Sequence, residues 1–218
     1  MSECVRVDVD NPAASVLKQA ANVVRGGGLI VYPTETLYGI GADATNASAI
    51  RKIQEVKRRQ ENKAILVIVD SEEMLRELVD RISGPAKQLM ERFWPGPLTL
   101  VFRASRLVPD ELTQGRRTIG VRIPSSNLCL KLLVEAGVPL TSTSANVSGK
   151  APERTVGRIQ EQLSGIDLYL DAGELPESLP STVVDVSFVV PRVLRQGAIS
   201  FEQLRQVVPD IQLSTSSS

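Results

Sequence analysis

Short apolar runs of strand length alternate with helical segments along almost the whole chain. Residues 29–32, 65–69 and 98–102 are typical of buried strands, because each is a largely apolar run of strand length. Residues 13–24 carry apolar side chains at helical spacing after Asn11-Pro12, which predicts an N-cap followed by the first helical position. Alternation of this kind predicts the α/β class: a twisted, mixed, open sheet with helices packed on it, and chemistry in the loops at strand ends.

The rest of the chain continues this alternation. Further strands are predicted at 118–123, 140–143, 168–170, 183–186 and 192–194. Further helices are predicted to begin at Asn46, Ser71, Ser125 or Ser126, Thr155 and Ser200. No linker rich in proline, glycine or serine divides the middle of the chain, so we expect a single domain over residues 1–213 and a disordered serine-rich tail over 214–218.

The composition excludes several kinds of chemistry. The chain has 25 basic side chains, 25 acidic side chains and no histidine. Because the charges balance, there is no bulk attraction to nucleic acid or to a membrane, and an anion site needs local clustering. Without histidine, Ser-His and Cys-His nucleophile pairs and histidine metal sites are excluded. An enzyme of this composition is expected to work by positioning and charge stabilisation, or with a hard metal held by oxygen ligands.

The cysteines and the apolar runs indicate the compartment. Cys4 and Cys129 lack the C-x-x-C spacing of a zinc site. The chain contains no P-loop, and no G-x-G-x-x-G follows a predicted strand. The longest aliphatic run, 65–69, is too short to span a bilayer, and the N-terminus opens no signal peptide. We therefore expect a cytoplasmic protein that makes no contact with membranes.

The segment Thr141–Gly149 places five hydroxyl groups and one amide directly after an apolar run. Short polar side chains of this kind hydrogen-bond to backbone amides or to the oxygens of a ligand, and they lose little entropy when fixed. A polar turn that satisfies its own backbone is the alternative. Residues 33–39 and Ser181-Thr182 also place hydroxyl groups at strand ends, and for the second pair simple capping of the strand is an adequate explanation.

Basic side chains form a second set of candidates. Four cations occupy residues 57–63, at the end of a predicted helix and immediately before an apolar run, where they suit either a phosphate group or a solvated helix end. Arg122 stands inside an apolar strand and needs a partner, which is either a structural salt bridge or a substrate carboxylate bound bidentately. Arg192 and Arg195 add cations near the end of the fold, where surface charge is the simpler explanation.

Six motifs occur in order along the chain. They are Pro33-Thr34-Glu35-Thr36-Leu37-Tyr38-Gly39, Lys57-x-Arg59, Pro95-Gly96-Pro97-Leu98-Thr99, Gly120-Val121-Arg122-Ile123-Pro124, Ser142-Thr143-Ser144-Ala145-Asn146-x-Ser148-Gly149 and Ser181-Thr182-Val183-Val184-Asp185. In this order, over residues 16–197, the chain resembles the short, single-domain form of the YrdC/TsaC family of L-threonylcarbamoyladenylate synthases. The resemblance implies a YrdC-like twisted α/β fold around a large cationic concave cavity.

The resemblance also implies an activity. L-threonine, bicarbonate and ATP would give threonylcarbamoyl-AMP and pyrophosphate, with Mg²⁺ accompanying the ATP. The proteins of a threonylcarbamoyl-transferase complex would then pass the threonylcarbamoyl group to an adenosine next to the anticodon of tRNA. Whether the chain itself binds tRNA is left open by the sequence.

Residue roles follow from the same resemblance. The implied catalytic residues are Lys57, Arg59, Ser144 and Asn146. The implied ATP-binding residues are Arg59, Lys63, Thr118, Ser144, Asn146 and Arg195. The implied threonine-binding residues are Thr36, Arg122, Ser142, Ser181 and Thr182, among which Arg122 would hold the threonine carboxylate. The metal ligands are not assigned, and the acidic candidates are Glu35, Asp43 and Asp185.

Two other functions fit parts of the sequence. A non-catalytic paralogue of the same fold would bind double-stranded RNA or tRNA in the cavity, but the balanced charge and an aromatic content of 4% argue against it. A carbamoyltransferase module of the hydrogenase-maturation type is expected to carry C-x-x-C zinc motifs, which the chain lacks. ATP consumption that depends on threonine and bicarbonate would distinguish the synthase from the RNA-binding paralogue.

Overall fold

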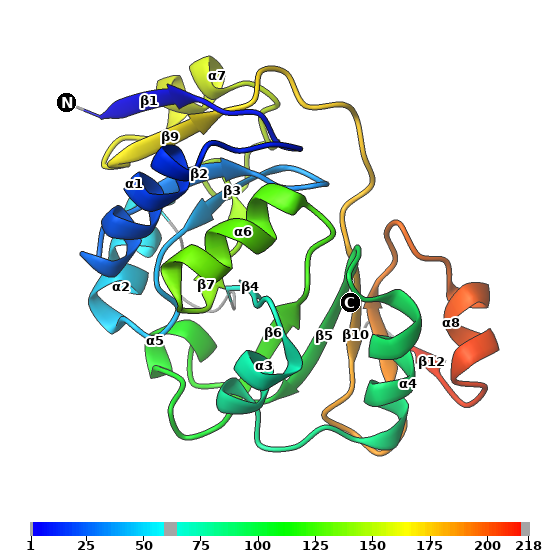
Figure 1. Ribbon diagram of the computed structural model, residues 1–218. Helices are drawn as coiled ribbons and strands as arrows, with labels where there is room; N and C mark the ends of the chain where they lie inside the picture. The colour runs from blue at the N-terminus through cyan, green and yellow to red at the C-terminus, as the bar shows by residue number, and fades with distance from the viewer. Residues whose placement is uncertain (1, 59–64, 215–218) are drawn as a thin grey trace.

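The computed structural model describes residues 2–58 and 65–214, which form two mixed β-sheets with helices packed around them (Figure 1). The predicted α/β class is therefore confirmed, with one difference: the strands divide into two sheets where the sequence predicted one. Arg59, Lys63 and residues 215–218 of the predicted tail lie outside the described residues.

The described residues form a five-stranded and a seven-stranded sheet. The smaller sheet contains, in spatial order, β1 (Glu3–Arg6), β9 (Leu168–Asp171), β2 (Ile30–Pro33), β3 (Tyr38–Gly41) and β8 (Thr143–Ser144). The larger sheet contains, in spatial order, β12 (Gln212–Leu213), β11 (Arg192–Arg195), β10 (Thr182–Asp185), β5 (Leu98–Arg103), β6 (Thr118–Arg122), β4 (Val67–Ile68) and β7 (Leu140–Thr141). Both sheets mix strand directions; β5, for example, is parallel to β10 and antiparallel to β6.

Helices connect and cover these sheets. The helices of the described residues are α1 (Ala14–Arg25), α2 (Ala47–Val56), α3 (Glu72–Leu78), α4 (Gly84–Phe93), α5 (Asp110–Thr113), α6 (Asn127–Ala136), α7 (Val156–Gln162) and α8 (Phe201–Val207). The side chains of Asn46, Ser71, Ser126 and Ser200 each accept a hydrogen bond from a backbone N–H of the first helical turn, which confirms these predicted starts. Within the two described ranges, the helices lack the combination of length and apolarity that crossing a membrane requires.

Helix α1 begins at Ala14, two residues later than Asn11-Pro12 predicts. The side chain of Asp8 accepts hydrogen bonds from the backbone N–H groups of Asp10 (2.9 Å) and Asn11 (3.1 Å). These bonds hold the chain in a turn, so Asn11 takes part in that turn and does not cap the helix. Ala13 occupies the N-cap position without a side-chain hydrogen bond.

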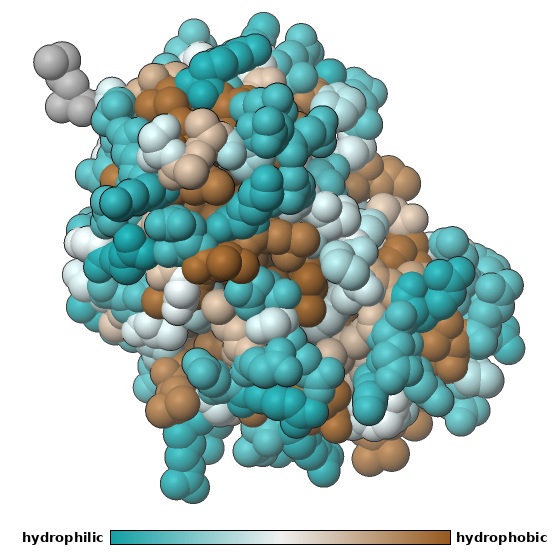
Figure 2. All heavy atoms as spheres, in the orientation of Figure 1, coloured by the Kyte–Doolittle hydropathy of each residue, from teal (hydrophilic) through white to brown (hydrophobic). Residues whose placement is uncertain are grey.

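Helices α1 and α6 lie side by side over the smaller sheet (Figure 1). Leu17 and Val24 of α1, Leu128 and Leu132 of α6, and Ile30 of β2 belong to one buried apolar cluster. Removing these side chains from water stabilises the contact by roughly 1.5–3 kcal/mol for each fully buried side chain. The face of the molecule seen in Figure 2 is mostly hydrophilic, with apolar residues in small patches.

The run from β7 to β8 joins the two sheets. Strand β7 pairs with β4 of the larger sheet, and β8, two residues later, pairs with β3 of the smaller sheet. Thr141, the last residue of β7, is fully buried, and its hydroxyl accepts a hydrogen bond from the N–H of Ala42 (2.9 Å) and donates to the carbonyl of Ile40 (3.1 Å). The hydroxyl of Tyr32 donates to the carbonyl of Thr141 (3.0 Å). The start of the hydroxyl-rich segment is therefore fixed to both sheets.

Replacing Thr141 by valine should lower the free energy of unfolding by about 1–3 kcal/mol, because the amide of Ala42 and the carbonyl of Ile40 lose a partner inside the core. Urea unfolding followed by circular dichroism would measure the change. Thr45→Val is the matched control, since Thr45 is exposed and its hydroxyl bonds to the side chain of Asp43; the change expected there is within about 0.5 kcal/mol. Wild-type stability of Thr141→Val would contradict this role.

Candidate active site

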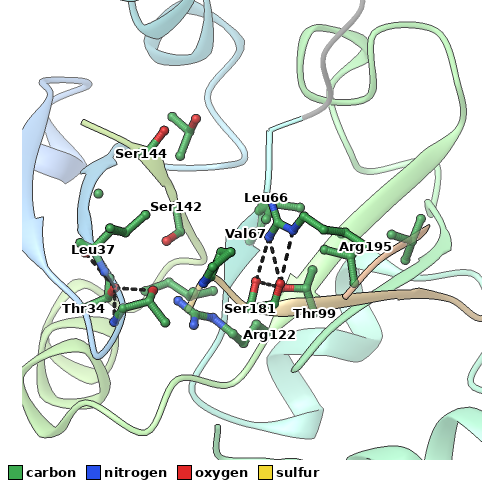
Figure 3. A pocket seen from close by; sticks show the side chains of 18 of the residues that line it. Thr34, Leu37, Leu66, Val67, Thr99, Arg122, Ser142, Ser144, Ser181 and Arg195 are labelled. Atoms are coloured by element: carbon green, nitrogen blue, oxygen red, sulfur yellow. Dashed lines mark hydrogen bonds between the residues drawn. The ribbon is translucent and has the colours of Figure 1, made fainter. Parts of the chain in front are cut away.

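A cavity of about 1330 Å³ lies where the two sheets meet, and its lining residues come from both (Figure 3). The larger sheet contributes parts of β4, β5, β6, β10 and β11, and the smaller sheet contributes the β2–β3 turn and β8. The charged side chains among the described lining residues are Arg58, Arg116, Arg122, Arg195 and Asp185. Cations therefore predominate in the lining, as an anion-binding site requires.

Side-chain alternation decides which residues of the larger sheet face the cavity. On β6, Thr118, Gly120 and Arg122 line the cavity, whereas Ile119 and Val121 belong to the apolar core. The same alternation selects Thr99 and Val101 on the neighbouring strand β5, and Val183 and Asp185 on β10, the strand beyond it. Because successive side chains of a strand point to opposite faces, one face of three adjacent strands forms a wall of the cavity.

Thr182 lies on the other face of β10 and does not line the cavity, contrary to the prediction. Its side chain is fully buried, and its hydroxyl donates to the carbonyl of Ile199 (2.7 Å). The same hydroxyl accepts hydrogen bonds from the N–H groups of Gly197 and Ile199, both at 3.0 Å. Thr182 thus fixes the segment after β11, while its neighbours Ser181 and Val183 face the cavity.

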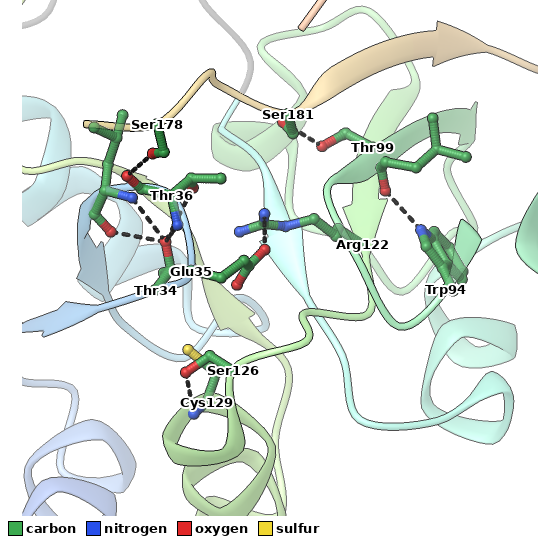
Figure 4. Close-up of polar contacts among 12 residues, drawn as sticks. Thr34, Glu35, Thr36, Trp94, Thr99, Arg122, Ser126, Cys129, Ser178 and Ser181 are labelled. Carbon is green, nitrogen blue, oxygen red and sulfur yellow. Dashed lines mark hydrogen bonds and ion pairs between the residues drawn. The ribbon is translucent and has the colours of Figure 1, made fainter. Parts of the chain in front are cut away.

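Arg122 is buried, with 6% of its surface exposed, and its Nη1 forms an ion pair with Oε1 of Glu35 (Figure 4). Arg122 ends β6, and Glu35 lies in the turn between β2 and β3, so this pair connects the two sheets. The second carboxylate oxygen of Glu35, Oε2, is buried and has no hydrogen-bond partner among the described residues. Arg122 also lines the cavity, so it is at once a salt-bridge partner and a cation available to a ligand.

Thr34 shapes the turn that carries Glu35. Its hydroxyl donates to the carbonyl of Leu37 (2.7 Å) and accepts hydrogen bonds from the N–H groups of Thr36 (3.2 Å) and Leu37 (3.1 Å). The hydroxyl oxygens of Thr34 and Thr36 lie 3.1 Å apart. Hydroxyl bonds of this kind stabilise a tight turn. The turn places Thr36 in the same cavity lining as Ser142, as the sequence predicted for both residues.

A polar cluster formed by Ser181, Thr99 and Arg195 crosses β5, β10 and β11 (Figure 3). Arg195 donates to the carbonyl of Ser181 through Nε (3.2 Å) and Nη2 (2.9 Å), and to its hydroxyl through Nη2 (3.2 Å). The hydroxyl oxygens of Ser181 and Thr99 lie 3.0 Å apart. Burial lowers the pKa of Arg195, and the nearby positive charge of Arg122 lowers it further. A bound anion would relieve the repulsion between these two guanidinium groups.

Lys57 is buried behind the loop that follows β8, and Asn146 is a buried residue of that loop. Neither is among the described lining residues, although direct contact with ATP would need them on the cavity surface. The ammonium group of Lys57 donates to the carbonyl of Ser144 and to that of Asn146 (2.8 Å). The side-chain amide of Asn146 donates to the carbonyls of Val147 (3.1 Å) and Lys150 (2.6 Å). Their described contacts therefore hold the loop, and they fix the position of Ser144, which lines the cavity.

The structure brings most of the predicted site residues together. Those that line the cavity are Thr36, Thr118, Arg122, Ser142, Ser144, Ser181 and Arg195. The predicted contacts of Arg59 and Lys63 fall outside the described residues and stay predictions. The lining residues that received no role from the sequence include Arg58, Thr99 and Arg116. Arg58 belongs to the cationic run and Thr99 follows from strand alternation, whereas Arg116 has no signal in a single sequence.

The thiol and phenol groups near the cavity are neutral at physiological pH. Burial raises the pKa of Cys129 to about 12. A hydrogen bond with Ser126 lowers this pKa, and the negative charge of Glu35 raises it further. Burial also raises the pKa of Tyr38 to about 12. Among the described residues, no three or more His, Cys, Asp or Glu side chains cluster to hold a metal ion, and the carboxylate in the described lining is that of Asp185. The polar groups of the described lining are therefore mainly arginines and hydroxyl groups, together with the carboxylate of Asp185.

Comparison with known proteins establishes the family. A family model for Sua5, YciO and YrdC proteins, described as "Telomere recombination", matches residues 22–197. The threonylcarbamoyl-AMP synthase of Pyrococcus abyssi is 36% identical over 198 residues, which are 90% of this chain and 58% of that protein. The chain belongs to the Sua5/YciO/YrdC family, as its motifs predicted.

Solved structures confirm the fold. The crystal structure of P. abyssi Sua5 complexed with L-threonine superposes with a TM-score of 0.90 at 34% identity, covering 98% of this chain and 62% of that one. The crystal structure of E. coli YciO superposes with a TM-score of 0.85 at 29% identity, covering 94% of this chain and 100% of that one. The chain thus spans about three fifths of the Pyrococcus protein and the whole length of YciO.

Replacing Lys57 by methionine should loosen the loop at residues 144–149, because the carbonyls of Ser144 and Asn146 lose a buried donor. Hydrogen exchange of the backbone amides in this loop should accelerate by about tenfold or more. Lys52→Met is the matched control: Lys52 lies on α2, the helix that Lys57 caps, and donates to a carbonyl, that of Gly27, away from the cavity. Equal exchange of the loop in both variants would show that Lys57 does not hold it.

Proposed function

We propose that this protein forms L-threonylcarbamoyladenylate and pyrophosphate from L-threonine, bicarbonate and ATP. The observation that carries the proposal is the cavity of about 1330 Å³, in which Arg122, Ser142, Ser144 and Arg195 come together from two sheets. A site for one drug-sized ligand typically has roughly 300–1,000 Å³, so this volume suits an amino acid and a nucleotide lying side by side. The name of the P. abyssi relative and the L-threonine in the P. abyssi Sua5 crystal structure support the same assignment.

The chemistry of this reaction suits the residues of the cavity. The amine of threonine attacks carbon dioxide derived from bicarbonate and forms a carbamate. An oxygen of the carbamate then attacks the α-phosphorus of ATP, and pyrophosphate leaves. Neither step needs a protein nucleophile, which agrees with the lack of histidine and the buried, neutral thiol of Cys129. The contribution of the protein is to neutralise charge and to align the carbamate with the phosphorus.

Residue roles can be proposed from where the side chains lie. Arg122 would bind the threonine carboxylate through N–H groups that Glu35 leaves unused. The hydroxyl groups proposed to surround the amino acid are those of Thr36, Ser142 and Ser181. The lining residues proposed to contact ATP are Thr118, Ser144 and Arg195, with Lys57 and Asn146 holding the loop of Ser144. Contacts of Arg59 and Lys63 with the triphosphate complete the proposal.

A magnesium ion would enter the cavity with ATP. Mg²⁺ is usually held by one or two carboxylates together with substrate phosphates, and the lining carboxylate of Asp185 fits this requirement. Its Oδ1 accepts hydrogen bonds from the N–H (2.9 Å) and the hydroxyl (2.6 Å) of Ser187, which orient the carboxylate. The ion would neutralise charge on the departing pyrophosphate. Asp43, another acidic candidate, does not line the cavity.

The biological role proposed for the product is modification of tRNA. Threonylcarbamoyl-AMP would pass to a threonylcarbamoyl-transferase complex, which modifies an adenosine next to the anticodon. The proposed compartment is the cytoplasm, where ATP, threonine and tRNA are all present. Direct binding of tRNA belongs to the alternative, non-catalytic function, and the assay below separates the two.

Incubation of the protein with ATP, Mg²⁺, L-threonine and bicarbonate should yield a product with the mass of threonylcarbamoyl-AMP. Omitting threonine or bicarbonate should abolish both this product and pyrophosphate release, because the carbamate is the attacking group. Liquid chromatography with mass detection measures the first, and a coupled phosphate assay measures the second. Pyrophosphate release that does not depend on threonine would contradict the proposal, and binding of tRNA without any product would favour the RNA-binding paralogue.

Arg122→Lys should raise the KM for threonine by about tenfold or more, because lysine keeps the charge opposite Glu35 but loses the planar fork that binds a carboxylate bidentately. The KM for ATP should change by less than about twofold, since the lining residues proposed to contact ATP are Thr118, Ser144 and Arg195. Arg103→Lys, an exposed change on the adjacent strand β5, is the control and should alter neither constant. Equal increases for both substrates in Arg122→Lys would refute the assignment.

A further inference from the structure

The ion pair between Arg122 and Glu35 leaves both partners with unused hydrogen-bonding capacity. A guanidinium group has five N–H donors, and Glu35 accepts a hydrogen bond from one of them, on Nη1. Oε2 of Glu35 has no hydrogen-bond partner among the described residues, although 18% of the Glu35 side chain is exposed. A carboxylate oxygen that is shielded from water and has no hydrogen-bond donor destabilises the folded protein. A ligand that supplies one donor to Oε2 would remove this cost.

The groups behind Glu35 do not supply that donor. Tyr32 and Cys129 are fully buried there, and the pKa of each is raised by burial first and by the negative charge of Glu35 in addition. The hydroxyl of Tyr32 donates to the carbonyl of Thr141, and the thiol of Cys129 donates to the carbonyl of Pro33 (3.5 Å). A missing donor must therefore arrive from the cavity side.

The cavity side is within reach of the Glu35 carboxylate. The side chain of Arg122 extends from β6 toward the turn that carries Glu35 and Thr36 (Figure 4), and both Arg122 and Thr36 line the cavity. The last torsion of a glutamate side chain has a broad, shallow energy profile. Glu35 is not itself among the described lining residues, but a partial rotation about this torsion, which moves both oxygens together, brings Oε2 nearer the cavity while Oε1 stays close to Arg122.

A free amino acid carries the two charges that match this pair. Near neutral pH its carboxyl group is ionised and its α-amino group is protonated, and one carbon atom separates them. A cation and an anion already in contact can bind both ends at once: the carboxylate on the remaining N–H groups of Arg122, and the ammonium on Oε2 of Glu35.

We propose that Glu35 binds the α-ammonium group of the amino-acid substrate while Arg122 binds its carboxylate. The pair then selects free α-amino acids against hydroxy acids, which lack the ammonium group. It also holds the substrate nitrogen at a fixed point in the cavity; release of one proton from the ammonium group to water then leaves the free amine that attacks carbon dioxide. The inference rests on the proposed function in one respect, the use of Arg122 for the substrate carboxylate.

Calorimetric titration with two ligands tests the inference. L-threonine carries the α-ammonium group, and 3-hydroxybutanoate is the same molecule without it. The wild-type protein should bind L-threonine at least about tenfold more tightly, the usual contribution of a charge-assisted hydrogen bond. Glu35→Gln, whose amide oxygen can still accept from Arg122, should lose most of this preference. Glu72→Gln, which weakens an exposed pair with Arg76, is the matched control and should keep it.

Several outcomes would overturn the inference. Equal losses of affinity for both ligands in Glu35→Gln would show that the ion pair only supports the fold. Tighter binding of L-threonine by Glu35→Gln would show that Glu35 competes with the substrate for Arg122. If Glu35→Gln does not fold, Glu35→Asp, which keeps the charge on a shorter side chain, should bind threonine more weakly but keep a preference for the ammonium group. Equal binding of the two ligands by the wild-type protein overturns the inference without any variant.

The proposed function fails separately from this inference. If the wild-type protein prefers L-threonine through Glu35 but forms no adenylate from ATP and bicarbonate, the synthase assignment is wrong and the Glu35 inference stands. If the adenylate forms but Glu35→Gln keeps the full preference for L-threonine, the function stands and the Glu35 inference is wrong.

Discussion

The buried hydrogen bonds of Thr141 tie the smaller sheet to the larger one, and the cavity depends on that connection. Three residues further along, Ser144 already belongs to the other sheet and faces the cavity. Arg122 and Glu35 make a second connection, by charge, on the same boundary. Because each sheet supplies only part of the lining, neither sheet alone forms the cavity. Buried polar bonds whose donors and acceptors are satisfied make this boundary rigid and so set the distance between the two sheets.

The sequence predicted strands correctly where apolar residues form clear runs, and poorly where pairing with a neighbouring strand determines the extended conformation. Residues 98–102 and 118–123 were recognised as strands, and the structure confirms β5 and β6 there. Strand β3 was missed because Tyr38–Gly41 contains two glycines, which have low strand propensity, and its extended form is stabilised by pairing with β2. Helix α4 was also missed, although Ser83 followed by a proline in the first turn is a helix-start signal.

The candidate site was predictable in its residue types but only partly in its geometry. Strand alternation separates Ser181 from Thr182, and applying it to the sequence would have placed Thr182 in the core. Strand alternation could not have placed Lys57, because its ammonium group bonds to the carbonyl of Ser144, which lies 87 positions along the chain. Local patterns contain no information on such a contact, which only the packing of the two sheets creates.

The burial of Cys129 and the lack of histidine have a practical consequence for chemical inhibition. Reagents that acylate a serine or alkylate a thiolate need an activated nucleophile, and the described lining offers hydroxyl groups without a neighbouring imidazole base. The arginines of the lining instead attract negatively charged compounds. Inhibitors of such a pocket are best sought among reversible, anionic molecules, which for the proposed reaction would join an amino-acid mimic to a nucleotide mimic, because the described lining offers an electrophile no activated nucleophile.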